Sequence, residues 1–63
     1  MCLAMVYADD VKQENLILSN VQRIECGDGF VVLTDLFERR ITVEGRLASV
    51  DLTGNTAVVE KRG

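Results

Sequence analysis

The sequence predicts an all-β fold, a small SH3-like barrel of five to six short antiparallel strands with one short 3₁₀ turn. Three observations support this prediction. Short runs rich in β-branched and aromatic residues follow one another, turn-forming residues separate them every several positions, and proline is absent. An OB-like barrel is the alternative, but a chain of 63 residues fits the smaller barrel better.

Two apolar runs predict the first two strands. Residues 3–8 carry no polar helical face and end at Asp9 and Asp10, which is typical of a strand followed by a loop. Residues 14–19 form a second apolar run that is too brief for a stable helix, and Asn20 supplies a turn after it. We therefore expect a strand over each run.

The hairpin in the middle of the chain is the clearest local signal. Residues 21–26 alternate between faces, which places Ile24 and Cys26 on the face predicted to be buried. Residues 27–29 read Gly-Asp-Gly, and an Asp-Gly pair favours a tight hairpin turn. Residues 30–34 are then the return strand, because their β-branched and aromatic side chains suit a pleated sheet.

One helical turn is expected after this return strand. Asp35 is followed by Glu38 at the spacing of a capping box. We expect the Asp35 carboxylate to accept hydrogen bonds from the free backbone amides of a single 3₁₀-like turn. We also expect Leu36 or Phe37, or both, to insert into one end of the core.

The last two strands are predicted over residues 40–52 and 56–60, with a tight turn at residues 53–55. Three apolar side chains of the longer strand are expected to face inward: Ile41, Val43 and Leu47. Gly45 falls on the same face, and a glycine inside a strand indicates a bulge, a bend or a close approach of another backbone. The apolar residues of this strand are at odd positions up to Leu47 and at even positions from Val50, so we expect the strand to bend between them.

Length and charge limit the classes of function. The 63 residues predict a single small β-barrel domain over residues 1–63, with a small core. Ten acidic and seven basic side chains give a net charge of −3, which disfavours a nucleic-acid partner. The basic pairs at 39–40 and 61–62 each follow a glutamate, which indicates a mixed-charge surface. Two cysteines, no signal-peptide pattern and no membrane-length apolar run predict a cytoplasmic protein with reduced thiols and no membrane partner.

The sequence does not predict an enzyme. Nucleophilic and acid–base catalysis need a base, most often histidine, and the chain has none. Asp9 and Asp10 are adjacent, so on a strand they would point to opposite faces, and an exposed acidic loop explains them better. The glycines at 27–29 precede a strand, whereas a phosphate-binding loop precedes a helix. We therefore expect the protein to act by binding.

Cys2 offers metal-binding chemistry that needs no folded site. Its thiolate lies beside its own backbone nitrogen and the α-amine of Met1, so sulfur and nitrogen can form small chelate rings on one metal ion. Such a ligand set suits the tetragonal or square-planar preference of Ni(II) or Cu(II). If Met1 is removed, the amine and thiolate of Cys2 remain. The structural alternative is that Cys2 is an ordinary small residue near a chain end.

A symmetric dimer would complete such a site. One chain supplies two or three ligands, whereas a closed metal site needs about four. A two-fold axis near Cys2 would bring two copies of the residue together and double the number of ligands. Cys26 has a different interpretation, because a free cysteine on an inward face behaves as a small hydrophobic residue.

Five segments that together cover nearly the whole chain form a recognisable pattern. They are residues 1–4 (MCLA), 16–25 (LILSNVQRIE), 33–37 (LTDLF), 43–47 (VEGRL) and 50–52 (VDL). This pattern resembles the CooT family of small nickel-binding proteins. The resemblance implies an SH3-like homodimer that binds Ni(II) through the cysteine after the initiator methionine, here Cys2. It also implies an accessory role in inserting nickel into carbon monoxide dehydrogenase, whereas Cys26 lies outside the family pattern.

We therefore hypothesise a nickel-binding accessory protein, a metallochaperone that holds Ni(II) through Cys2 and Met1 at a homodimer interface. The alternative is a β-barrel interaction module for nucleic acid or protein without metal, which would require a clustered basic and aromatic face. The aromatic residues are Tyr7, Phe30 and Phe37, and both phenylalanines are expected in the core. A third hypothesis, a purely structural dimerisation unit, predicts that Cys2 is dispensable.

Overall fold

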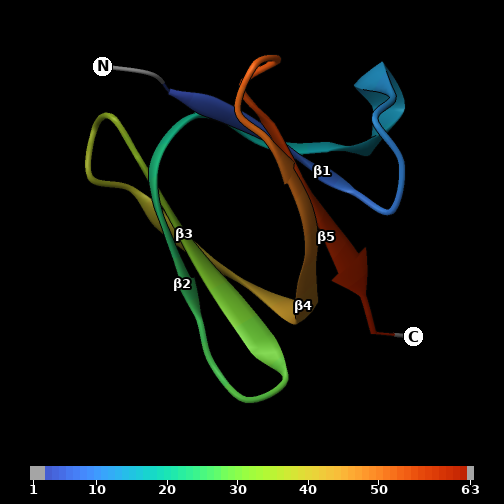
Figure 1. The fold of residues 1–63 in the computed structure, drawn as a ribbon. Helices are drawn as coiled ribbons and strands as arrows, with labels where there is room; N and C mark the ends of the chain where they lie inside the picture. Colours follow the sequence, from blue (N-terminus) through green and yellow to red (C-terminus); the bar gives the residue numbers. More distant parts are fainter. Residues whose placement is uncertain (1–2, 63) are drawn as a thin grey trace.

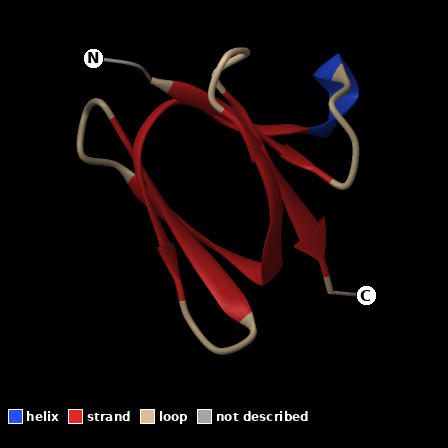
Figure 2. Cartoon of the chain, in the orientation of Figure 1, coloured by secondary structure: helices blue, strands red, loops and turns tan. Residues whose placement is uncertain are grey.

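The computed structural model describes residues 3–62, which form one closed β-barrel of five strands (Figure 1). The elements in chain order are β1 (Ala4–Ala8), the 3₁₀ helix η1 (Gln13–Asn15), β2 (Leu16–Cys26), β3 (Phe30–Asp35), β4 (Arg40–Asp51) and β5 (Thr56–Lys61). Each strand pairs antiparallel with the next, and a parallel pair between β1 and β5 closes the barrel. The predicted all-β barrel is confirmed (Figure 2).

The core fills the inside of the barrel with aliphatic side chains from every strand. Its buried members are Val6, Val21, Val31, Leu33, Val43, Ala57 and Val59. The inward position predicted for Val43 is confirmed, and Leu47 is half-buried against the core. Ile41 at the start of β4 pairs with the buried Leu33, so it lies on the predicted inward face, but 37% of it is exposed. Phe30 at the start of β3 is exposed, so its predicted burial was wrong. In residues 3–62, no helix has the length and hydropathy needed to cross a membrane.

One long strand replaces two predicted ones. Residues 14–19 and 21–26 are not separate strands joined by a turn, because β2 runs unbroken through Asn20. Asn20 has a φ of 54°, a left-handed conformation that asparagine adopts more readily than most residues. The pairing of β1 with β2 shifts register around it. A residue of this kind can form a bulge within a strand as well as a turn between strands, and here it forms the bulge.

Cys26 does not join the core. The register of β2 against β3 shifts between Val21 and Arg23, which changes the faces on which the following side chains lie. Val21 is buried, Ile24 is half-buried, and Cys26 at the hairpin end of β2 is exposed with a free thiol. The predicted burial of Cys26 was therefore wrong. Cys26 pairs with the core residue Val31, but it is the last residue of β2, at the hairpin end of the barrel, where its side chain is exposed.

The β3–β4 connection is a tight turn, and no 3₁₀ helix is assigned there. A 3₁₀ helix is found at a different place, η1, in the segment between β1 and β2. In the β3–β4 turn, the Glu38 amide donates to the Asp35 carbonyl over 3.0 Å, and Glu38 takes a φ of 67°. Leu36 and Phe37 are exposed at the tip of this turn, so the expectation that they enter the core was wrong.

β4 departs from regular pairing where the sequence predicts it. Gly45 is buried with a φ of 147°, and a Cβ atom there would overlap the carbonyl oxygen of Glu60 on β5. The register of β4 against β5 also shifts between Leu47 and Ser49. The predicted close backbone approach at Gly45 is confirmed, and an irregularity is found where the bend is predicted.

Three features share one end of the barrel (Figure 1). β1 begins there at Ala4, which pairs with Val21, and Val21 pairs in turn with Asp35 at the end of β3. The Met5 amide donates to the Asn55 carbonyl in the β4–β5 turn over 2.9 Å. The start of β1, the β3–β4 turn and the β4–β5 turn therefore lie together, and we call this the amino end of the barrel. The β2–β3 hairpin lies at the opposite end (Figure 1).

Candidate functional site

The two predicted metal ligands, Met1 and Cys2, lie outside the described residues. The described chain starts at Leu3 and enters β1 at Ala4. β1 is held on both sides, because it pairs with β2 along one edge and with β5 along the other. The surfaces around Leu3 and Ala4 are therefore the described surroundings of the candidate site.

A shallow hollow of about 70 Å³ lies beside the start of β1. Its lining comes from β1 and from the β4–β5 connection: Leu3, Ala4, Val50, Asp51, Leu52, Asn55 and Thr56. Asp51 is the single carboxylate of this lining, and aliphatic side chains supply much of the remainder. The described surroundings of the predicted ligands are thus more apolar than acidic.

The Asp51 carboxylate shapes the turn beside this hollow. Its Oδ1 accepts hydrogen bonds from the Thr53 hydroxyl at 2.6 Å, the Thr53 amide at 3.0 Å and the Gly54 amide at 3.1 Å. The Thr53 hydroxyl, followed by the Gly54 and Thr53 amides, lowers the pKa of Asp51 below its ordinary value. Asp51 is therefore ionised at neutral pH with one oxygen committed to the turn. Within residues 3–62, no group of three or more potential metal-ligating side chains comes together.

Large apolar side chains are exposed on the two turns at the amino end. Leu36 and Phe37 lie on the β3–β4 turn, whereas Val50 lies near the end of β4 and Leu52 follows it, 81% exposed. The Arg39 guanidinium lies over the Phe37 ring, 5.3 Å from its centre. Exposed apolar groups gathered on one region of a protein indicate a contact surface. We call Leu36, Phe37, Val50 and Leu52 the apolar rim.

A buried carboxylate fixes the β3–β4 turn of this rim. Asp35 Oδ1 accepts hydrogen bonds from the amides of Phe37 and Arg39, both at 2.9 Å, and Oδ2 accepts one from Arg39 Nε at 2.7 Å. Burial by itself raises the pKa of Asp35, but the hydrogen bonds from Arg39 and Phe37 and the Arg39 charge together outweigh burial and lower the pKa. The predicted role of Asp35 as the acceptor for free turn amides is confirmed.

Comparison with known proteins identifies the family. The family model described as CO dehydrogenase accessory protein CooT matches residues 1–60. This chain belongs to the CooT family. The matched range includes both predicted ligands, Met1 and Cys2. The description is that of an accessory protein, not of a catalyst, and no curated protein matches the chain.

A solved structure shows the same fold as this CooT chain. It is described as CooT from Carboxydothermus hydrogenoformans, and the match covers 98% of this chain and 100% of that one with a TM-score of 0.83. The two sequences are 18% identical, so the likeness concerns the fold and not particular ligands. The family-model match over residues 1–60 confirms the family membership expected from the five sequence segments.

Among the other sequence candidates in this CooT protein, Asp9 has a structural role. Asp9 follows β1 and its Oδ1 accepts a hydrogen bond from the Lys61 amide at 3.1 Å, while Asp10 is exposed. The hairpin predicted at residues 27–29 is confirmed by its position between β2 and β3. Cys26 lies next to this hairpin, at the end of the barrel opposite to the start of β1 (Figure 1).

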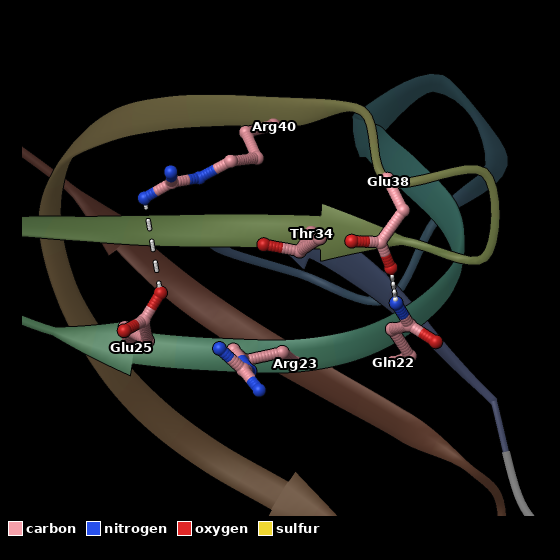
Figure 3. Close-up of a pocket in the computed structure, with 6 residues that line it drawn as sticks. All are labelled: Gln22, Arg23, Glu25, Thr34, Glu38 and Arg40. Carbon is pink, nitrogen blue, oxygen red and sulfur yellow. Dashed lines mark hydrogen bonds and ion pairs between the residues drawn. The ribbon is translucent and has the colours of Figure 1, made fainter.

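A polar groove on the outer face of β2, β3 and β4 is absent from the sequence predictions for this CooT chain (Figure 3). It encloses about 300 Å³ and is lined by Gln22, Arg23, Glu25, Thr34, Glu38 and Arg40. In the sequence these residues belong to three separate segments and have the character of an ordinary polar surface. Strand register brings them together, and the alternation of a single strand does not specify which residues of its neighbour lie opposite.

Proposed function

We propose that this CooT protein binds Ni(II) through Cys2 at a homodimer interface and delivers the metal to carbon monoxide dehydrogenase. The observation that carries the proposal is the family match, which spans residues 1–60 and therefore includes Cys2. The matched family is described as accessory to CO dehydrogenase. The resemblance of the opening segment to nickel-binding members supplies the identity of the metal, which is cargo and not a resident cofactor.

Ligand chemistry supports Cys2 as the centre of the proposed site. The Cys2 thiolate, the Cys2 backbone nitrogen and the amine of Met1 are neighbours along the chain, so they can chelate one ion without contributions from distant residues. Sulfur and nitrogen ligands suit the tetragonal preference of Ni(II). Residues 3–62 bring together no alternative group of three or more metal-ligating side chains. The affinity for nickel is therefore expected to come from the first two residues.

The apolar rim supports a second copy of the chain as the dimer partner. The two turns that carry the rim share the amino end of the barrel with the start of β1, where Ala4 follows Cys2 and Leu3. A two-fold axis through this end would place the rim of one copy against the rim of the other, because a two-fold interface uses the same patch on both subunits. It would also bring the two Cys2 residues close enough to share one ion.

Nickel transfer to nickel-free carbon monoxide dehydrogenase tests the proposal. The protein loaded with Ni(II) is mixed with the nickel-free enzyme and a chelator that removes free metal, and CO oxidation is followed. Wild-type protein should restore activity at least about tenfold better than the Cys2→Ser variant, because loss of a ligand is expected to weaken the site by more than loss of an outer-shell partner. The matched Cys26→Ser variant should act as the wild type. Equal activation by Cys2→Ser and wild type would contradict delivery through Cys2.

A further inference from the structure

We propose that the polar groove of β2, β3 and β4 binds a carboxylate side chain, an aspartate or glutamate on the surface of the enzyme that receives the nickel. This inference rests on the proposed function, since it names the contact between the accessory protein and its client. The groove is open along the sheet and lined entirely by polar and charged residues (Figure 3).

The centre of the groove is a row of three paired residues. Arg23 on β2 lies opposite Thr34 on β3, and Thr34 lies opposite Arg40 on β4. Directly paired side chains on one face of a sheet stand about 5 Å apart. The core residue Leu33 precedes Thr34 and faces inward, so this row faces outward. Two guanidinium groups therefore flank one hydroxyl, as Figure 3 shows.

Two polar groups in this row have unused hydrogen-bonding capacity. The Thr34 side chain lines the groove, and its hydroxyl makes no hydrogen bond within residues 3–62. This hydroxyl is open to the groove, since no buried side-chain polar atom of the described residues lacks a hydrogen-bond partner. Arg23 forms no ion pair within the same described range, whereas Arg40 does. A hydroxyl donor and a guanidinium fork are a suitable pair of partners for one carboxylate.

The remaining lining leaves room for such a ligand. Arg40 is 3.9 Å from Glu25, with the two side chains 65% and 52% exposed, so this ion pair is loose and contributes little. An incoming carboxylate can replace Glu25 as the partner of Arg40. At the other end, Glu38 accepts a hydrogen bond from the Gln22 amide group. Glu38 has a left-handed φ of 67°, which glycine adopts more readily. The carboxylate of Glu38 itself lines this end of the groove.

The charges and shape of the groove favour a protein side chain over other anions. Two arginines line it but so do two glutamates, so the lining suits a single negative group held between the arginines better than the repeated phosphates of a nucleic-acid backbone. Small-molecule sites usually enclose most of the ligand surface, whereas the Arg40 and Glu25 side chains of this groove are 65% and 52% exposed. A carboxylate presented by a larger protein would be shielded by the protein that carries it.

The position of the groove suits transfer from the amino end. Val21 of β2 pairs with Ala4 at the start of β1, and Arg23 follows it by two residues. Glu38 belongs to the β3–β4 turn, which lies at the same end of the barrel. A client bound along the groove would therefore be close to the end at which the chain carries Cys2.

Titration of the ¹⁵N-labelled, metal-free protein by NMR tests this inference independently of nickel. The probes are N-acetyl-glutamate N-methylamide, the matched glutamine compound and inorganic phosphate. We expect saturable shifts at the Thr34 amide and the Arg23 side chain with the glutamate probe, with a dissociation constant on the order of ten millimolar. Arg23→Gln should weaken this binding about tenfold, and Thr34→Val about threefold. The matched charge change Arg46→Gln, outside the groove, should have no effect.

Three results would overturn the inference. The first is the absence of a saturable shift at these residues with the glutamate probe, and the second is unchanged binding in Arg23→Gln. The third is tighter binding of phosphate than of the carboxylate, which would make the groove a phosphate site and not a contact for a protein side chain. Because the titration contains no metal, a failed nickel-transfer experiment and a failed carboxylate titration are separate outcomes.

Discussion

Replacement of Asp35 by alanine is expected to lower the melting temperature by roughly 10 °C or more. The Asp35 side chain is buried and accepts three hydrogen bonds, two from backbone amides and one from Arg39. Alanine would leave these donors without their partner in the turn that carries Leu36 and Phe37, and unpartnered donors are costly when water cannot replace the lost acceptor. Thermal unfolding followed by circular dichroism measures the change.

Two variants separate the contributions to this turn. Arg39→Gln removes the ion pair but retains both amide bonds to Asp35, so it should cost a few degrees at most. Asp35→Asn retains an acceptor oxygen but removes the charge, so its melting temperature should lie between those of wild type and Asp35→Ala. A melting temperature of Asp35→Ala within about 2 °C of the wild-type value would show that the carboxylate does not hold the turn.

The pH dependence of stability gives a signature of the same carboxylate. The folded protein lowers the pKa of Asp35, whereas an unfolded chain has the ordinary value of about 3.9. As the pH falls, the unfolded state therefore binds this proton first. The stabilisation is fully present well above pH ~4 and is lost as the pH falls through the lower folded pKa. Asp35→Asn should flatten the acid side of the stability profile, while Asp51, whose pKa is also lowered, remains in both proteins.

Substitution of Gly45 by alanine is expected to destabilise the barrel by about 3 kcal/mol or more. The residue has a φ of 147°, and an added Cβ would overlap the Glu60 carbonyl oxygen and lie 2.9 Å from the Lys61 Cα. Both neighbours are backbone atoms of the paired strand β5, so neither can move without disturbing the sheet. Domains of this size rarely have more than roughly 3–5 kcal/mol of stability. Urea denaturation should therefore show that a large fraction of Gly45→Ala is unfolded in buffer alone.

Gly54→Ala is the matched control for this substitution. An added Cβ at Gly54 meets the Asp51 Oδ2 at 3.1 Å, which is a side-chain atom, and Gly54 does not have a positive φ. We expect a change in unfolding free energy within about 1 kcal/mol. Equal destabilisation by the two variants would mean that loss of glycine in general, and not the close approach of β4 to β5, determines the effect.

Local signals made part of the fold predictable. The Asp-Gly pair before β3, the glycine inside β4 and the Asp35 carboxylate each act on neighbouring backbone, so their roles follow from residue type and spacing. The failures concern pairing between strands. Asn20 is a bulge and not a turn, and Cys26 is exposed because β2 ends there, at the hairpin end of the barrel. Neither property is encoded in the alternation of one segment, because both depend on the strand that lies beside it.

The candidate site also has one part that the sequence predicted and another part that it did not. Cys2 and Met1 were predicted from chemistry that needs no fold, and the family match includes them, although they lie outside the described residues. The apolar rim and the polar groove could not be predicted, because each is assembled from separate segments by the closure and register of the barrel. Phe37, for example, is expected in the core from its apolar character, but the turn fixed by Asp35 leaves it 68% exposed.

Calorimetric titration of Ni(II) into the reduced, tag-free protein, with absorption spectra of the same samples, tests the central claim most directly. Wild type and Cys26→Ser should bind one nickel ion per two chains and show a thiolate-to-nickel charge-transfer band. Cys2→Ser should lose the band and bind at least about a hundredfold more weakly, because a direct ligand is removed. Unchanged affinity in Cys2→Ser, or loss of binding in Cys26→Ser alone, would contradict a nickel site built on Cys2.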